Sequence, residues 1–232
     1  NAFIGSAYTE SISYRFLGNL CRKAGGRLAG SPSAKLAKQM ILSELNRMNI
    51  TSQVNSYQKP GWERGRDYIR LIQPFDKEIR AYSLGYSQPM SKTYADLVVV
   101  RDGNSSDYEG INAVGKFVLI IPDGNSGKPA LSRNELINIA AEHSACAVLF
   151  SGTKDGGMVL VRVANFEGKA TPIPAFCITK EDGLLLRSQI ESGLTPKVEA
   201  EVNSKCKEIE IANIRAIFPG KSAKKVLLLA HY

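Results

Sequence analysis

The 232-residue sequence predicts a mixed α/β fold of the α+β type, and three observations support this prediction. Two stretches near the start carry apolar residues at helical spacing. From residue 60 to about residue 203, short strand-like runs are broken by Gly, Pro, Asn and Asp. Two further apolar runs close the chain. Hydrophobic residues make up 44% of the chain and charged residues 22%, a composition that favours a packed core over disorder.

The positive charge of the chain is dispersed. Thirty Lys and Arg against 22 Asp and Glu give a net charge of +8, but no basic run is longer than a pair such as Lys224 and Lys225. We therefore predict no nucleic-acid partner. We also predict no membrane span, because the longest apolar run, residues 145–150, is far shorter than the roughly 18 residues that a spanning helix needs. No signal peptide is recognisable at the start.

Two helices are expected before residue 60. The first covers residues 8–24, where apolar residues recur at helical spacing before a pair of glycines. Ser31 is a natural N-cap for the second helix, with Pro32 in its first position, and this helix continues to about Asn49. Residues 51–57 are typical of a strand.

The middle of the chain is predicted to be strand-rich. The expected strands cover residues 68–72, 79–84, 97–100, 117–121, 147–150, 158–163, 175–178 and 197–202. Two helices interrupt them, one opened by a capping box from Ser132 to Glu135 and the other by a similar start at Thr179. Residues 115–150 therefore read as a βαβ unit.

The end of the chain predicts a hairpin. Residues 208–218 alternate between apolar and polar, a Pro-Gly turn follows, and residues 225–230 are almost continuously apolar. A strand of that kind is expected to be buried on both faces.

The composition changes near residues 60 and 203. We therefore predict that residues 60–203 form a domain of their own, inserted between residues 1–59 and residues 204–232 of a second domain. The two flanks total only about 88 residues and would make a poor independent core.

The four cysteines show no metal-binding or redox spacing. They are Cys21, Cys146, Cys177 and Cys206. Four buried small hydrophobic side chains are the favoured interpretation, and one or two disulfides are the alternative if the protein is exported. Asn49 and Asn104 each begin an N-glycosylation acceptor pattern, which favours export weakly.

Two patterns that resemble catalytic motifs are rejected. Residues 124–128 look like a phosphate loop, but Pro122 stands where the first Gly belongs and Pro129 replaces the hydroxyl residue that would hold magnesium. No G-x-S-x-G motif exists, and a serine triad needs a histidine base. His143 lies at the end of a predicted helix, where a structural role is favoured. We predict no catalytic residue and no cofactor-binding residue in this chain.

His231 is the candidate metal ligand. It follows the predicted buried strand of residues 225–230 and so would lie at the carboxyl end of that strand, where ligands gather in α/β sheets. A neutral imidazole held there is suited to bind zinc. An ordinary histidine at a strand end is the alternative.

The residues around this histidine resemble a known family. Arg27-Leu28-Ala29-Gly30-Ser31-Pro32 before a helix resembles the N-terminal signature of zinc-dependent exopeptidases of the aminopeptidase/glutamate carboxypeptidase type. In that family the chain later reads N-[IV]-x-A-x-[IL]-x-G, a loop, an apolar strand and H-x-D. Residues 213–220, 226–230 and 231–232 follow this order.

The segment between these motifs resembles a protease-associated domain. Residues 62–65, 115–118 and 173–179 look closest to the plasma glutamate carboxypeptidase (carboxypeptidase Q) branch of the family. The resemblance implies a strand-rich protease-associated domain inserted into the opening helices and strands of a truncated α/β zinc-exopeptidase domain. Trp62 and Arg64 could contact substrate or a dimer partner, but a guanidinium packed on an aromatic ring is favoured.

The resemblance also implies an activity that the chain does not complete. Family members hold two zinc ions with a His and several carboxylates, plus a glutamate general base, and cleave dipeptides or terminal residues of short peptides. Only the first ligand, matching His231, falls within this sequence. We expect the isolated chain to be inactive and to bind no zinc. The inserted domain is expected to form a lid over the site or to contribute to a homodimer, and the parent protein to be secreted, periplasmic or lysosomal.

Two alternatives remain open at this point. Some relatives, such as the transferrin-receptor ectodomain, keep the architecture without the metal site, and a receptor-like protein would lack the acidic residue two positions after His231. A stand-alone protease-associated module for protein interaction is the other alternative. In that case the last segment only packs against the rest of the chain.

Overall fold

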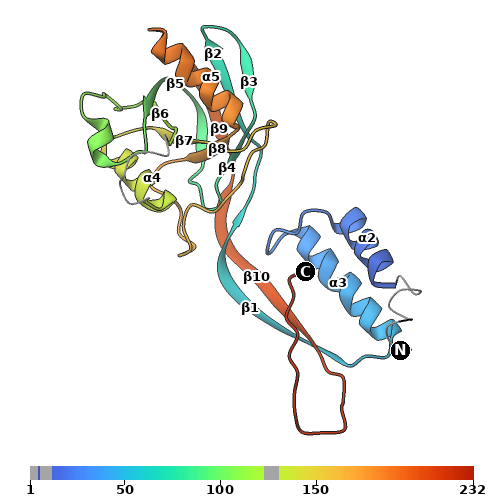
Figure 1. Cartoon of the computed structure of the whole chain (residues 1–232). Helices are drawn as coiled ribbons and strands as arrows, with labels where there is room; N and C mark the ends of the chain where they lie inside the picture. Colours follow the sequence, from blue (N-terminus) through green and yellow to red (C-terminus); the bar gives the residue numbers. More distant parts are fainter. Residues whose placement is uncertain (1–4, 6–11, 123–130) are drawn as a thin grey trace. The chain divides into compact units, whose positions relative to one another are not determined.

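The structure is a computed structural model that describes residues 5, 12–122 and 131–232 (Figure 1). It confirms the mixed α/β fold class, with helices and a strand-rich sheet. The chain forms two compact units, one made of Asn1–Gly61 and Glu208–Tyr232 and the other of Trp62–Lys207. We call them the helical unit and the sheet unit. Among the helices described here, none has both the length and the apolar character needed to cross a bilayer.

Two helices form the core of the helical unit. They are α2 (Ile12–Ala24) and α3 (Pro32–Arg47), as predicted, although residues 8–11 of the first predicted helix lie outside the described residues. The hydroxyl of Ser31 accepts a hydrogen bond from the backbone N–H of Ala34 at 3.1 Å, so the predicted N-cap is confirmed. Leu20, Ala24 and Ala37 are the buried residues between the helices.

The predicted strand after α3 and the predicted strand near residue 210 both form, and they pair with each other. They are β1 (Ser52–Glu63) and β10 (Lys205–Ala216), which make a two-stranded sheet. Ile209 of β10 lies so close to the backbone that a Cβ placed on Gly61 would come within 2.3 Å of its side chain. Gly30 meets the same side chain, at 2.6 Å, and has a φ of +76°. Glycine is therefore required at both positions.

The predicted hairpin is wrong. Residues 225–230 form no strand, and the side chains of residues 226–229 are 78–90% exposed. An apolar run becomes a buried strand only where a neighbouring strand takes up its backbone hydrogen bonds and another layer covers its side chains. Within the described residues, β10 pairs with β1 instead, and nothing covers the closing run.

The sheet unit contains an eight-stranded sheet in the order β3-β2-β9-β5-β6-β7-β8-β4. Its strands are β2 (Asp67–Gln73), β3 (Lys77–Ile79), β4 (Ala81–Ser83), β5 (Met90–Val100), β6 (Phe117–Ile120), β7 (Ala147–Ser151), β8 (Ala175–Ile178) and β9 (Lys197–Val202). The four strands β5, β6, β7 and β8 run parallel, and the remaining pairings are antiparallel. The carboxyl ends of β6, β7 and β8 therefore meet at one edge of the sheet.

Two helices cover opposite faces of this sheet (Figure 1). They are α4 (Arg133–Glu142) and α5 (Lys180–Glu191), and a short 3-10 turn, η1 (Ser105–Tyr108), lies before β6. Alternate residues of β6 point to opposite faces, so Leu119 packs with Leu186 of α5 whereas Val118 packs with Ile137 of α4. The β6-α4-β7 segment is the predicted βαβ unit, and the predicted capping box at Ser132 is confirmed.

Two predicted strands of this unit differ from the structure. Residues 79–84 are divided into the end of β3 and β4, because the N–H of Arg80 donates to the Asp182 carboxylate at 3.3 Å rather than to a strand. Residues 158–163 form no strand and make only one bridge, between Gly85 and Val163. The neighbouring edge strand, β4, is only three residues long, so it offers few backbone N–H and C=O groups with which another strand could pair.

The interpretation of the cysteines as four buried side chains is only partly correct. Cys177 is buried and Cys146 is half-buried, but Cys21 and Cys206 are exposed, and all four carry free thiols. Burial raises the pKa of Cys146 to about 11, so this thiol is protonated at neutral pH.

Candidate functional site

His231, the predicted metal ligand, is an exposed residue that does not follow a strand. The prediction that His231 lies at the carboxyl end of a buried strand is therefore wrong. Its neighbour Tyr232 is anchored: the phenol O–H donates to the carbonyl of Ala212 in β10 at 2.8 Å, and the ring packs against the core between α2 and α3. The anchor holds residue 231 beside β10 although residues 226–229 are exposed.

His231 lines a cavity of about 300 Å³ within the helical unit. The motif that begins at Arg27 forms one wall and β10 forms another. The lining residues are Arg27, Ala29, Gly30, Ala34, Lys35, Lys38, Glu210, Ile211, Ala212, Asn213, Ala230, His231 and Tyr232. The family resemblance rested on the motif that begins at Arg27, the motif that begins at Asn213 and the segment that ends in His231. Residues from all three line this one cavity.

The charge of this cavity is positive. Among the described residues that line it, Arg27, Lys35 and Lys38 are basic and Glu210 is acidic, with the Glu210 carboxylate 3.4 Å from the ammonium of Lys38. Arg27 donates from Nη1 to the carbonyl of Gly25 at 2.9 Å, and its buried Nε has no hydrogen-bond partner in the described part of the chain. Such a cavity favours the binding of an anionic group.

The described residues do not make a zinc site. A zinc ion in a protein takes about four ligands. Of the residues that line the cavity, His231 and Glu210 are the zinc donors, and Glu210 is already paired with Lys38. Across residues 5, 12–122 and 131–232, no group of three or more His, Cys, Asp or Glu side chains is arranged to hold a metal ion.

The second histidine has the structural position predicted for it. His143 is the C-cap of α4, and its ring stacks on that of Tyr108 with centroids 4.3 Å apart and planes 5° from parallel. Tyr108 is buried, and desolvation raises the pKa of its phenol. This pair packs α4 against the turn before β6.

The favoured packing of Trp62 and Arg64 is also confirmed. The Arg64 guanidinium carbon lies 4.7 Å from the centroid of the buried Trp62 ring and 5.3 Å from that of Tyr82. Burial lowers the pKa of Arg64, and the nearby carboxylate of Asp67 opposes this shift. Ser83 donates from its N–H and from its hydroxyl to Oδ2 of Asp67, the same oxygen that lies near Arg64. The cluster is a structural one.

The sequence reasoning missed a polar cluster on the sheet unit. Glu199 of β9 accepts a hydrogen bond from the Tyr68 hydroxyl at 2.9 Å and lies 3.4 Å from the ammonium of Lys92. Hydrogen bonds, that from Tyr94 foremost, lower the pKa of Glu199, so this carboxylate is ionised and fully engaged at neutral pH. The sequence of β9 alternates between polar and apolar residues, and this pattern predicts polar side chains on one face of the strand. It was the signal from which the cluster could have been predicted. The phosphate-loop-like segment at residues 124–128 lies outside the described residues.

The comparisons with known proteins agree on one class of enzyme. No family model matches the chain. Carboxypeptidase Q of Xenopus laevis is 24% identical over 201 residues, which cover 84% of this chain and 43% of that protein. The zinc aminopeptidase BSAP of Bacillus subtilis matches with a TM-score of 0.70 and 21% identity over 91% of this chain and 48% of its own.

Two further structures give the same result. The peptidase M28 precursor of Shewanella amazonensis SB2B has a TM-score of 0.68 and 20% identity over 91% of this chain and 51% of its own. An aminopeptidase from Aneurinibacillus sp. strain AM-1 has a TM-score of 0.64 and 22% identity over 92% of this chain and 49% of its own. The chain spans about half the length of these relatives. It is thus similar in sequence to a carboxypeptidase and in fold to zinc aminopeptidases, which confirms the predicted resemblance to exopeptidases of the aminopeptidase/carboxypeptidase type.

Proposed function

We propose that this chain is part of a zinc metallo-exopeptidase that hydrolyses dipeptides or the terminal residues of short peptides. The likeness of 91% of the chain to about half of a zinc aminopeptidase carries this proposal. The site lies in the helical unit, at the cavity beside His231. We refer below to the polypeptide that contains these 232 residues and the rest of the enzyme as the longer protein.

Within the longer protein, His231 is one zinc ligand, and the remaining ligands and the general base come from residues outside this chain. Zinc in such enzymes acts as a Lewis acid and activates water. Because the described residues supply too few ligands, the 232-residue chain is inactive alone. The basic side chains Arg27, Lys35 and Lys38 bind the carboxylate of a short peptide, since they outnumber the carboxylates in the cavity. The longer protein works in a secreted, periplasmic or lysosomal compartment.

The sheet unit is a protease-associated domain in this proposal, with a role in substrate access or dimer contacts rather than in chemistry. Its cluster at Glu199 is engaged in internal pairs, with Tyr68 and Lys92. Deleting residues 60–203 from the longer protein is expected to admit longer peptides as substrates. If the size limit for substrates is unchanged while the variant remains folded and active, the lid role is wrong.

The activity is tested on two proteins in parallel, the 232-residue chain and the longer protein. Zinc content is measured by atomic absorption, and hydrolysis is followed with a panel of dipeptides. We expect the longer protein to hold zinc and to cleave, to lose activity with a chelator and to regain it with zinc. The short chain is expected to do neither.

Two results would contradict the proposal. Stoichiometric zinc and dipeptide cleavage by the 232-residue chain alone would show that its site is complete. A longer protein without an acidic residue two positions after His231, and without zinc or hydrolysis, would point instead to a receptor-like binding protein.

A further inference from the structure

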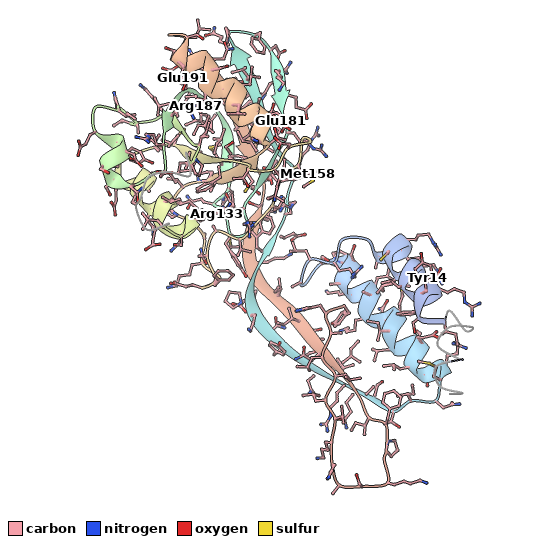
Figure 2. The ribbon with its side chains drawn as sticks, viewed as in Figure 1. Tyr14, Arg133, Met158, Glu181, Arg187 and Glu191 are labelled. Atoms are coloured by element: carbon pink, nitrogen blue, oxygen red, sulfur yellow. The ribbon has the colours of Figure 1, made fainter. Side chains whose placement is uncertain are left out.

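A second, smaller cavity lies in the sheet unit, at the carboxyl ends of β7 and β8. These strands are parallel, and Ser151 at the end of β7 is paired with Ile178 at the end of β8. The cavity has a volume of about 60 Å³. Its lining residues are Arg133, Phe150, Ser151, Gly152, Thr153, Leu160, Arg162, Cys177 and Ile178. Arg133 stands at the start of α4 and is labelled in Figure 2.

Two arginines give this cavity its charge. Arg133 and Arg162 are the charged members of the lining, and no Asp or Glu is among the described residues that line it. The acidic side chains nearby in sequence are already engaged. Asp155 lies 2.7 Å from the ammonium of Lys180, and Glu181 accepts hydrogen bonds from the backbone N–H groups of Gly156 and Gly157 at 2.8 and 3.1 Å.

Arg133 is held in place but is not satisfied. Its guanidinium carbon lies 5.4 Å from the centroid of the Phe150 ring, a cation–π contact that restricts the side chain. Its Nε is buried and has no hydrogen-bond partner in the part of the chain that the structure describes. A buried donor without a partner is costly, so Arg133 carries hydrogen-bonding capacity that the described residues do not use.

Arg133 and Arg162 line this cavity together with Cys177. Burial raises the pKa of the Cys177 thiol, and the charges of Arg133 and Arg162 oppose this shift. The thiol itself is neutral and buried. Arg162 is exposed and lies at the solvent side, whereas Arg133 is partly buried. The cavity is therefore a half-open positive pocket with a neutral floor.

We propose that this pocket binds a small free inorganic oxyanion, of the kind of phosphate or sulfate, between Arg133 and Arg162. Planar guanidinium forks match the oxygen geometry of such ions. A cavity of about 60 Å³ is roughly twice the share of liquid volume that one water occupies, which is room for a small ion and not for a peptide. This binding is independent of the proposed peptidase activity.

The test is a calorimetric titration of inorganic phosphate into the full 232-residue chain at constant ionic strength. Arg162→Gln removes the exposed donor, and because Arg162 is at the surface this variant is expected to fold. We expect its Kd for phosphate to rise about tenfold, the effect of losing one charge-assisted hydrogen bond. Lys154→Gln is the matched control, since it removes one exposed positive charge from the same loop but does not line the pocket. It should leave the Kd within about twofold of the original.

A second variant distinguishes the contribution of the planar guanidinium donors from that of the positive charge. Arg133→Lys keeps the positive charge and loses the planar donors, so we expect it also to raise the Kd about tenfold, with sulfate behaving as phosphate does. Equal effects of Arg162→Gln and Lys154→Gln, or no measurable binding to the original chain, would overturn the proposal. So would a tenfold preference for methyl phosphate over free phosphate, which would show that the pocket takes the end group of a larger molecule.

Discussion

Replacing His231 by Gln in the longer protein is expected to lower kcat/KM for dipeptides by more than about a hundredfold. Loss of a group that merely orients a metal ligand already costs about 10- to 100-fold, so loss of a ligand should cost more. Gln retains a polar side chain of similar length, and His231 is exposed, so the substitution should not disturb folding. The zinc content of the purified protein should fall together with its activity.

His143→Gln is the matched control for this prediction. It removes the other histidine of the chain, which stacks on Tyr108 in the sheet unit and does not line the cavity beside His231. We expect this variant to lose some stability through the lost ring contact, but to keep its zinc and its kcat/KM. If both variants lose activity equally, or if His231→Gln keeps its zinc and activity, His231 is not a ligand.

Replacing Phe176 by Ala is expected to lower the free energy of unfolding of the sheet unit by about 3–5 kcal/mol. Phe176 is fully buried in β8, which lies between β7 and β4, and its side chain belongs to the core on the α5 face. Truncation removes the buried ring and leaves a cavity that the surrounding strands can fill only in part. Urea unfolding, followed by circular dichroism at 25 °C, measures the change.

Phe166→Ala provides the comparison, since the same ring is 98% exposed at that position. A substitution at such a site should change the free energy of unfolding by no more than about 0.5 kcal/mol. A loss of less than about 1 kcal/mol for Phe176→Ala would show that β8 is not a central strand of the core.

Local signals were sufficient for most of the helices and strands. Ser31 and Ser132 accept the hydrogen bonds that their cap positions predict, and the helix that starts after Thr179 begins with the same kind of bond, to the N–H of Asp182 at 3.0 Å. Strands β8 and β9 have the predicted bounds. Caps and alternation depend on neighbours within a few residues, so the sequence carries this information directly.

The candidate site was predictable in part. The order of motifs led to His231 and to the exopeptidase resemblance, and the comparisons support that resemblance. The basic side chains that share the cavity with His231 could not be chosen in advance. Lys35 and Lys38 lie on α3, and their proximity to residue 231 depends on the contact of Tyr232 with β10. The pair Arg133 and Arg162 was hidden for the same reason, because 29 positions separate the two residues and only the parallel arrangement of β7 and β8 brings their segments together.

Sequence alone established the fold class, the cap residues, most of the elements and the exopeptidase resemblance, because each of these is written in short-range patterns or in the order of motifs. The tertiary structure decided which strands pair with each other and which apolar segments are covered. The run at residues 225–230 is as apolar as a central strand, yet it is exposed, because β10 pairs with β1 and the described residues offer no layer to cover the run. Whether an apolar segment is buried depends on the strands and layers that pack against it, and the sequence of the segment alone does not identify them.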